Sequence, residues 1–292
     1  CIAVGEFAEM KDDSGAVPLG YFVAKPQAAM LKPTFQETGK VLKFFSDKIG
    51  YPYPYPKYDQ VVIADFMWGG MENTTITTIT DRALVPAGFR PYYDSDPLVA
   101  HEAAHQWWGD LLTCKNWSQT WLNEGFATYF EALFTEHNLG LDEFRYEMIG
   151  NARAYLKEDA EKYRRPIVSP KYDDTSDMFD CHSYQKGACV LHMLRWVLGE
   201  EMWWKAIRHY AHKHQRQVVE TTDLKVAIEE ATGLHLDAFF RQWIHMAGHP
   251  EFELAWDYDE PAKMLSLKVK QTQKAEGETP VFRMPVDVFV QT

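Results

Sequence analysis

The spacing of apolar residues predicts both strands and helices in residues 1–90. Within residues 1–25, two extended segments flank the turn DDSGAVPLG. From Pro33 the apolar residues recur at helical spacing as far as Ile49, and Gly50 predicts the end of that helix. VVIADF and ITTIT, which follow, have the composition of buried strands. This first part is therefore expected to mix α and β structure.

The rest of the chain changes its apolar period once. From Asp96 to about Ala247 the apolar residues repeat at helical spacing, so this part is expected to be mainly helical. From Phe252 the segments FELAWDY, MLSLKVKQ and VFRMPVDVFV alternate apolar and polar residues, which predicts a β-meander. We predict three domains: 1–25 as the end of an N-terminal β-domain, 26–250 as an α+β domain, and 251–292 as the start of a β-sandwich domain.

Composition excludes several classes of protein. With 46% hydrophobic residues among 292, the chain can bury a sizeable core. Its net charge of -12 argues against nucleic-acid binding, which requires clustered Lys and Arg. Its apolar runs are shorter than the roughly 18 residues of a membrane helix, so no transmembrane segment is expected. The four cysteines are too few and too irregularly spaced for a disulfide framework or a zinc ribbon.

Two histidines lie four residues apart in the stretch DPLVAHEAAHQWWGD. Asp96 is expected to cap a helix that ends at Gly109, which places His101 and His105 on one face. Two imidazoles at this spacing can bind one zinc ion, but such pairs also occur by chance in ordinary helices. A catalytic zinc site needs a third protein ligand and a position left for water.

The segment WLNEGFATYFEALF offers the third ligand, Glu124, which follows His105 after 18 intervening residues. A hairpin of two helices would bring this carboxylate to the face of the two histidines. Gly125 costs roughly 1 kcal/mol relative to alanine inside a helix, which suggests that another backbone or a substrate comes close. Glu102 lies about 100° around the helix from His101, where it can act on a zinc-bound water as general base and then acid.

Three segments of the chain stand in a defined order: WGGMENTT lies upstream of HEAAHQWWGD, and WLNEGFATY follows with its 18-residue gap. Together these segments resemble the zinc aminopeptidases of the aminopeptidase N family. This family is a branch of the thermolysin-like gluzincins. The resemblance runs through essentially the whole chain, including SYQKGACVLHML and TTDLKVAIEEATGLHLDAFFRQWIHMAGHP. It implies a thermolysin-like catalytic domain, with a mixed α/β N-terminal lobe and a mainly helical C-terminal lobe, followed by part of a small β-domain.

The resemblance also implies roles for residues outside the histidine helix. In the family the GxMEN segment lies along the substrate, and its glutamate binds the free α-amino group. Here that glutamate is Glu72, and Gly69, Gly70 and Met71 form the adjoining backbone. A family tyrosine that stabilises the oxyanion corresponds to Tyr184 in SYQKG.

The chain departs from the family pattern at several positions. Gly70 replaces the usual alanine, and Thr74 and Thr75 replace the usual Trp-Gly after the motif. Ala103 stands where leucine is common, which we interpret as a change of packing only. The family has a further N-terminal β-domain and a C-terminal helical domain, so such domains are expected in the full-length protein.

These observations predict a zinc-dependent aminopeptidase that removes N-terminal residues from peptides and binds one zinc per chain. Three alternatives remain: a zinc endopeptidase, which would not need Glu72; an epoxide hydrolase of the leukotriene hydrolase type; and an inactive peptide-binding fragment. The histidines of HYAHKH, namely His209, His212 and His214, are interpreted as an exposed helix face and not as a second metal site.

Overall fold

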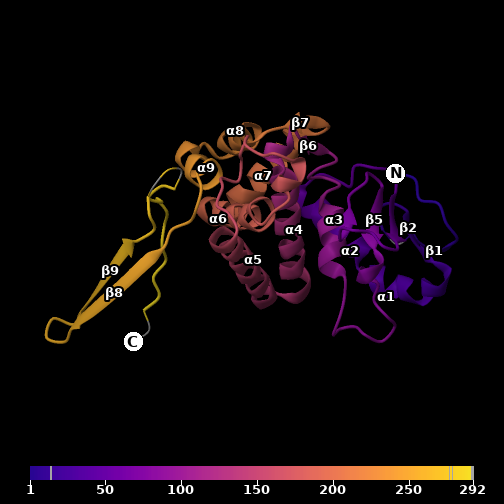
Figure 1. The fold of residues 1–292 in the computed structure, drawn as a ribbon, viewed down its shortest axis with the longest axis horizontal. Helices are drawn as coiled ribbons and strands as arrows, with labels where there is room; N and C mark the ends of the chain where they lie inside the picture. Colours follow the sequence, from indigo (N-terminus) through magenta and orange to yellow (C-terminus); the bar gives the residue numbers. More distant parts are fainter. Residues whose placement is uncertain (14, 276, 278, 291–292) are drawn as a thin grey trace.

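A five-stranded sheet forms one end of the molecule (Figure 1). The computed structural model describes residues 1–13, 15–275, 277 and 279–290. Across the sheet the order is β1 (Phe7–Asp12), β2 (Leu19–Ala24), β3 (Tyr58–Ile63), β5 (Ile76–Thr80) and β4 (Gly70–Met71). β3 is parallel to β2 and β5, whereas β4 pairs antiparallel with β5 at the edge. The strand predicted from ITTIT is confirmed in full as β5, whereas β3 covers only the first three residues of VVIADF and begins earlier, at Tyr58.

Two helices, α1 (Leu31–Phe35) and α2 (Thr38–Ile49), take the place of the single helix predicted from Pro33. The break falls at Gln36 and Glu37, where the apolar spacing continues without a helix-breaking residue. α2 ends at Gly50 as predicted, and this residue has the left-handed backbone conformation (φ 68°) that favours glycine.

Helices build the middle of the molecule, as the apolar period predicts (Figure 1). In chain order they are α3 (Asp96–Ala104), α4 (Trp121–Leu139), α5 (Leu141–Glu161), α6 (Gly187–Leu198), α7 (Glu200–His214), α8 (Thr221–Thr232) and α9 (Asp237–Ile244). Two short parallel strands, β6 (Leu112–Cys114) and β7 (Gln217–Val219), interrupt them. The fully buried side chains of Trp107, Trp108 and Phe130 join α2, α4 and α7 in one core, and α3 lies between this core and β4.

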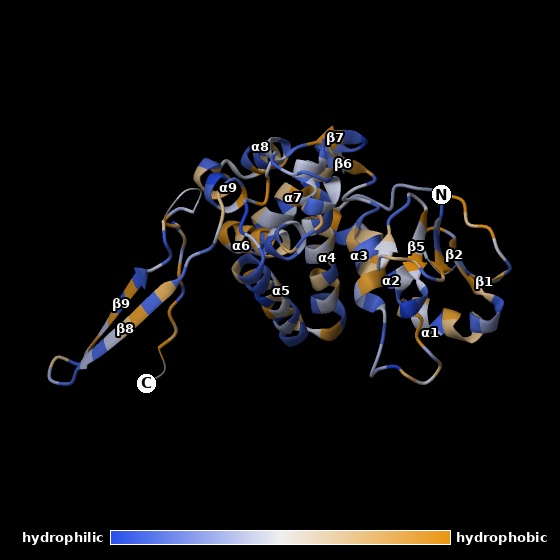
Figure 2. Ribbon diagram, in the orientation of Figure 1, coloured by the Kyte–Doolittle hydropathy of each residue, from blue (hydrophilic) through white to orange (hydrophobic). Residues whose placement is uncertain are grey.

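The C-terminal region forms a hairpin of β8 (Phe252–Asp259) and β9 (Met264–Gln271) that extends away from the helices (Figure 1). Figure 2 shows the alternation of apolar and polar residues along β8. In the register, Leu254 faces Val269 and Trp256 faces Leu267, so one face of the hairpin is apolar and exposed. The prediction of a third strand in the meander is wrong, because residues 281–290 form no strand and do not extend the two-stranded sheet of the hairpin.

The structure bears on two further expectations. Within the residues that it describes, no helix combines the length and the apolar character needed to cross a membrane. Each of the four cysteines is a free thiol. The domain boundaries near residues 25 and 250 stay predictions, although β1 and β2 lie in the same sheet as β3.

Candidate active site

The histidine helix, α3, is shorter than predicted. It ends at Ala104 and not at Gly109, so His105 occupies the position just after the last helical residue. The N–H groups of Gln106 and Trp107 donate to carbonyls three residues back, which tightens the turn and breaks the helix. At the other end the predicted cap by Asp96 is wrong: Asp96 is the first helical residue, Ser95 precedes it without a side-chain capping bond, and the Asp96 carboxylate pairs with the guanidinium of Arg90.

His101, His105 and Glu124 are brought together between α3 and α4, with their ligand atoms within 4.8 Å of one another. Glu124 Oε2 lies 3.4 Å from His101 Nε2 and 3.2 Å from His105 Nε2, and the two nitrogens are 3.3 Å apart. Ligand atoms about 2.0–2.1 Å from a tetrahedral zinc ion would lie about 3.3 Å apart. Three donors at this spacing, two of them buried and the third partly buried, therefore fit one zinc-sized cation.

Each imidazole is oriented through its other nitrogen. His101 Nδ1 lies 3.1 Å from Glu131 Oε2, and His105 Nδ1 lies 2.9 Å from the carbonyl of Trp108, to which it donates. Both contacts leave the Nε2 atoms facing Glu124, as a metal site requires. Glu131 was missed in the sequence, although it follows Glu124 by seven residues, two helical turns, and so lies on the same face of α4.

The carboxylates make this cluster electrostatically suited to a cation. Burial disfavours the imidazolium of His101, but the hydrogen bonds to Glu124 and Glu131 outweigh it and raise its pKa to about 10. Burial likewise disfavours the Glu124 carboxylate, but the two histidines outweigh it and lower its pKa to about 2. The carboxylates that stabilise an imidazolium here would also stabilise a metal cation held by the two histidines in their neutral form.

Gly125 allows α4 to touch the turn that carries Tyr184. The backbone of Gly125 packs against Gly187 and the carbonyl of Ser183. A Cβ on Gly125 would come within 3.0–3.2 Å of these backbone atoms. The prediction that another backbone comes close at Gly125 is confirmed. As a result, the Tyr184 ring stacks on His101 with centroids 6.1 Å apart. Burial and the nearby Glu124 carboxylate hold the pKa of Tyr184 far above its usual range, so its hydroxyl stays protonated.

Glu102 projects from α3 against the backbone of β4. A Cβ on Gly70 would come within 2.2 Å of Glu102 Oε1, so glycine permits this approach. The Glu102 side chain is buried, and within the described residues its Oε2 has no hydrogen-bond partner. Burial raises the pKa of this carboxyl to about 8. A buried carboxyl with a free oxygen and a pKa near neutrality is suited to accept and return a proton.

The GGMEN segment lies directly beside the metal cluster. Gly70 and Met71 form β4, and the carbonyl of Gly69 accepts the N–H of Thr80 from β5. The following Glu72 side chain is largely buried, with Oε1 3.8 Å from His105 Nδ1. All nine residues predicted for the site line one cleft of about 1430 Å³.

A second group of possible metal ligands consists of Glu158, Asp180 and His182, and His182 begins the turn that carries Tyr184. Its carboxylates are already matched by cations: Arg165 Nη2 lies 2.5 Å from Asp180, and Lys162 Nζ lies 3.0 Å from Glu158. Asp180 also accepts the N–H of His182. This cluster therefore holds the turn in place by ion pairs and hydrogen bonds and gives no reason to expect a second ion.

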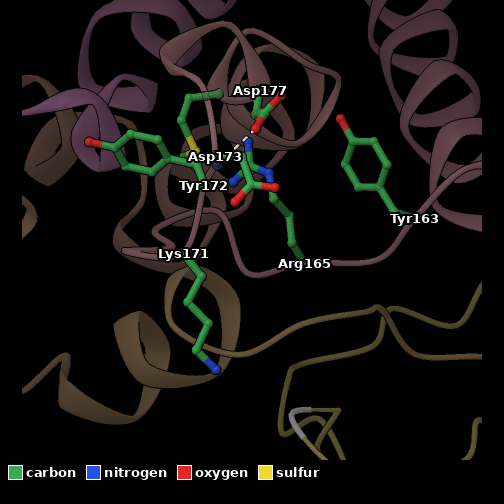
Figure 3. Close-up of a pocket in the computed structure, with 7 residues that line it drawn as sticks. Tyr163, Arg165, Lys171, Tyr172, Asp173 and Asp177 are labelled. Carbon is green, nitrogen blue, oxygen red and sulfur yellow. Dashed lines mark hydrogen bonds between the residues drawn. The ribbon is translucent and has the colours of Figure 1, made fainter.

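A smaller hollow of about 570 Å³ borders the same cluster. In Figure 3 the side chains of Lys171 and Tyr172 point in different directions, away from Arg165. Arg165 itself is engaged by Asp180 and by the carbonyl of Ile167. Because its polar groups do not converge, this hollow is a weaker candidate for chemistry than the cleft.

The three histidines of HYAHKH do not converge either. His209 pairs with Glu230 at 2.9 Å, and His212 Nε2 lies 2.9 Å from the carbonyl of Gly50. His214 is buried and contacts Gln217, so only part of the predicted exposed face is exposed.

The fold and the cleft define a mixed α/β protein with a His–His–Glu group that could hold a metal ion. Residues 34–243 match the Peptidase family M1 domain, and the chain belongs to this family. Membership of this metallopeptidase family implies a bound metal ion.

Curated relatives extend well beyond this chain. It is 34% identical to Aminopeptidase M1-C of Oryza sativa subsp. japonica over 72% of its own length and 25% of the relative's. Identity to Glutamyl aminopeptidase of Bos taurus is 31%, over 86% of this chain and 27% of the relative. Aminopeptidase N of Streptomyces lividans is 32% identical, over 82% of this chain and 30% of the relative. The chain thus spans roughly a quarter to a third of the length of these relatives.

Proposed function

We propose that this protein is a zinc aminopeptidase with a thermolysin-like catalytic domain, which removes single residues from the N-terminus of peptides. One observation carries the proposal. The metal-binding group, Glu102, Tyr184 and Glu72 line the same cleft, although they come from four separate segments of the chain. The names of the relatives support the same activity, since those given above are all aminopeptidases.

His101, His105 and Glu124 would hold the zinc ion. Their two nitrogens and one oxygen are donors that zinc prefers, and three protein ligands leave a position for water or substrate. When bound, zinc supplies a Lewis acid that acidifies water and polarises a carbonyl group. Glu131 would keep the His101 ring in place, as carboxylates commonly do for zinc-bound histidines.

Glu102 would move the proton. It lies one residue after His101 with a free oxygen, so it can take a proton from the attacking water and return it to the leaving amine. The Tyr184 ring stacks on His101, and its hydroxyl would donate a hydrogen bond to the carbonyl oxygen as negative charge develops there.

The edge strand β4 would align the substrate. One side of β4 pairs with β5, and among the described residues no strand pairs with its other side. An extended peptide can add to such an edge through backbone hydrogen bonds. Glu72, at the end of this strand, would then bind the free α-amino group by a charge-assisted hydrogen bond. This recognition is what separates an aminopeptidase from an endopeptidase with the same metal.

The test compares one peptide in its free and N-acetylated forms. Acetylation leaves the largely buried Glu72 facing a neutral amide, so kcat/KM should fall by about 100-fold, equivalent to about 3 kcal/mol. Glu72→Gln should lose most activity on the free peptide and narrow the difference between the two forms. Glu9→Gln, on the exposed surface of β1 in the same sheet, is the matched control and should behave like the wild type. Equal cleavage of both forms by the wild type would contradict the aminopeptidase proposal and favour an endopeptidase.

A further inference from the structure

The turn that follows β4, residues 72–75, has an unfavourable backbone conformation. Thr75 has φ 68°, in the left-handed region that a β-branched residue rarely adopts. Such a conformation persists only where the surroundings hold it, and it is found preferentially at functional sites.

The side chain of Gln106 holds both ends of this turn. Its Oε1 accepts the N–H of Thr75 at 3.0 Å, and its Nε2 donates to the carbonyl of Glu72 at 3.2 Å. Nε2 also donates to Asp110 at 2.8 Å, and the hydroxyl of Tyr53 lies 3.0 Å from Oε1. Gln106 is fully buried, so these four contacts are all made away from bulk solvent.

Only an uncharged amide satisfies these partners. An acceptor must face the Thr75 N–H, and donors must face the Glu72 carbonyl and the Asp110 carboxylate. A glutamate would place a second carboxylate against Asp110 and provide no donor for Glu72. A methionine would fill the same space but remove the acceptor for the Thr75 N–H and the donors for the Glu72 carbonyl and Asp110.

Gln106 also adjoins the metal-binding group, since it follows His105 directly in the tight turn after α3. A rigid connection therefore runs from a metal ligand to the backbone of Glu72. In an aminopeptidase the scissile carbonyl and the free amine belong to the same residue, joined through one Cα, so the distance between the amine anchor and the metal must be narrowly defined.

We propose that Gln106 is a positioning residue for amine recognition, which sets the place of Glu72 relative to the metal. This inference rests on the proposed aminopeptidase function. It assigns to Gln106 no contact with the substrate, and its effect is exerted through the backbone of residues 72–75.

Binding of leucine hydroxamate and of N-acetyl-leucine hydroxamate to the zinc-loaded protein tests this without requiring turnover. The hydroxamate group binds zinc in both compounds, so the ratio of their dissociation constants measures recognition of the free amine. We expect the wild type to favour the free amine by about 100-fold. In Gln106→Met this ratio should fall at least about tenfold while zinc content stays at one per chain. Gln106→Glu, which keeps the shape and one acceptor, should reduce the ratio in the same direction.

Gln60→Met is the control, because Gln60 is an equally buried glutamine in β3 whose side chain accepts a hydrogen bond from Thr38. It should keep the wild-type ratio. An unchanged ratio in both Gln106 variants would overturn the inference, as would loss of zinc from both or an equal fall in Gln60→Met. A wild-type ratio near one would refute the proposed function itself, which is a different outcome.

Discussion

The contact between Gly125 on α4 and Gly187, the first residue of α6 directly after the Tyr184 turn, is the packing feature on which the cleft geometry most depends. In Gly125→Ala the new Cβ would lie 3.0 Å from the Ser183 carbonyl oxygen and 3.1 Å from Gly187 Cα. Ordinary contacts are about 3.5–4.0 Å. Both neighbours are backbone atoms, which cannot rotate away, so the two elements must separate by roughly half an ångström.

The size of the effect follows from two opposing terms. Alanine gains about 1 kcal/mol over glycine in a helix interior. Overpacking costs about 1–3 kcal/mol. The variant should therefore be destabilised by up to about 2 kcal/mol. Because Glu124 and Tyr184 lie on opposite sides of this contact, their spacing changes, and a shift of this size should lower kcat by about 10- to 100-fold.

Peptide turnover, zinc content and thermal unfolding are measured together. Zinc content should stay at one per chain, because His101 and His105 do not move with the Tyr184 turn. Gly150→Ala is the matched control: Gly150 lies inside α5, where a Cβ would meet nothing within 4 Å. That variant should be stabilised by up to about 1 kcal/mol with unchanged kcat. A Gly125→Ala variant with wild-type kcat and a raised Tm would refute the reasoning.

Three further changes test two residues of the site and one buried lysine, Lys186, outside the cleft. Glu102→Ala should keep zinc and lose turnover by several orders of magnitude, because one carboxyl both takes and returns the proton; near-normal kcat would contradict this role. Glu131→Gln should weaken zinc affinity by about 10- to 100-fold in a competition titration with a chelator, and unaltered affinity would show that the His101 ring is held by other contacts. Burial lowers the pKa of Lys186 to about 7. Between pH 7 and about 10 this amine is therefore neutral when folded and protonated when unfolded, so its burial destabilises the fold most below pH 7. The Tm of the wild type should rise relative to Lys186→Met across that window, and parallel curves would exclude the linkage.

Local spacing in the sequence was enough to predict the elements and residues that depend on neighbours along the chain. The stop of α2 at Gly50, the strand β5 and the alternation in β8 follow from the conformational preferences of short segments. The pairing of His101 with His105 follows from helical periodicity. Glu72 and Tyr184 were predicted through family resemblance, since nothing in their local sequence distinguishes them from other glutamates and tyrosines.

Tertiary contacts decided the rest, because the groups involved are far apart in sequence. α3 ends early where Trp107 and Trp108 enter the core, so His105 lies outside the helix that was expected to contain it. The amide of Gln106 meets the backbone of Glu72 across 34 positions of the chain. Gly70 and Glu102 likewise meet only when β4 packs on α3. A periodic pattern states which face a residue occupies, but which groups meet across that face is set by the packing of whole elements.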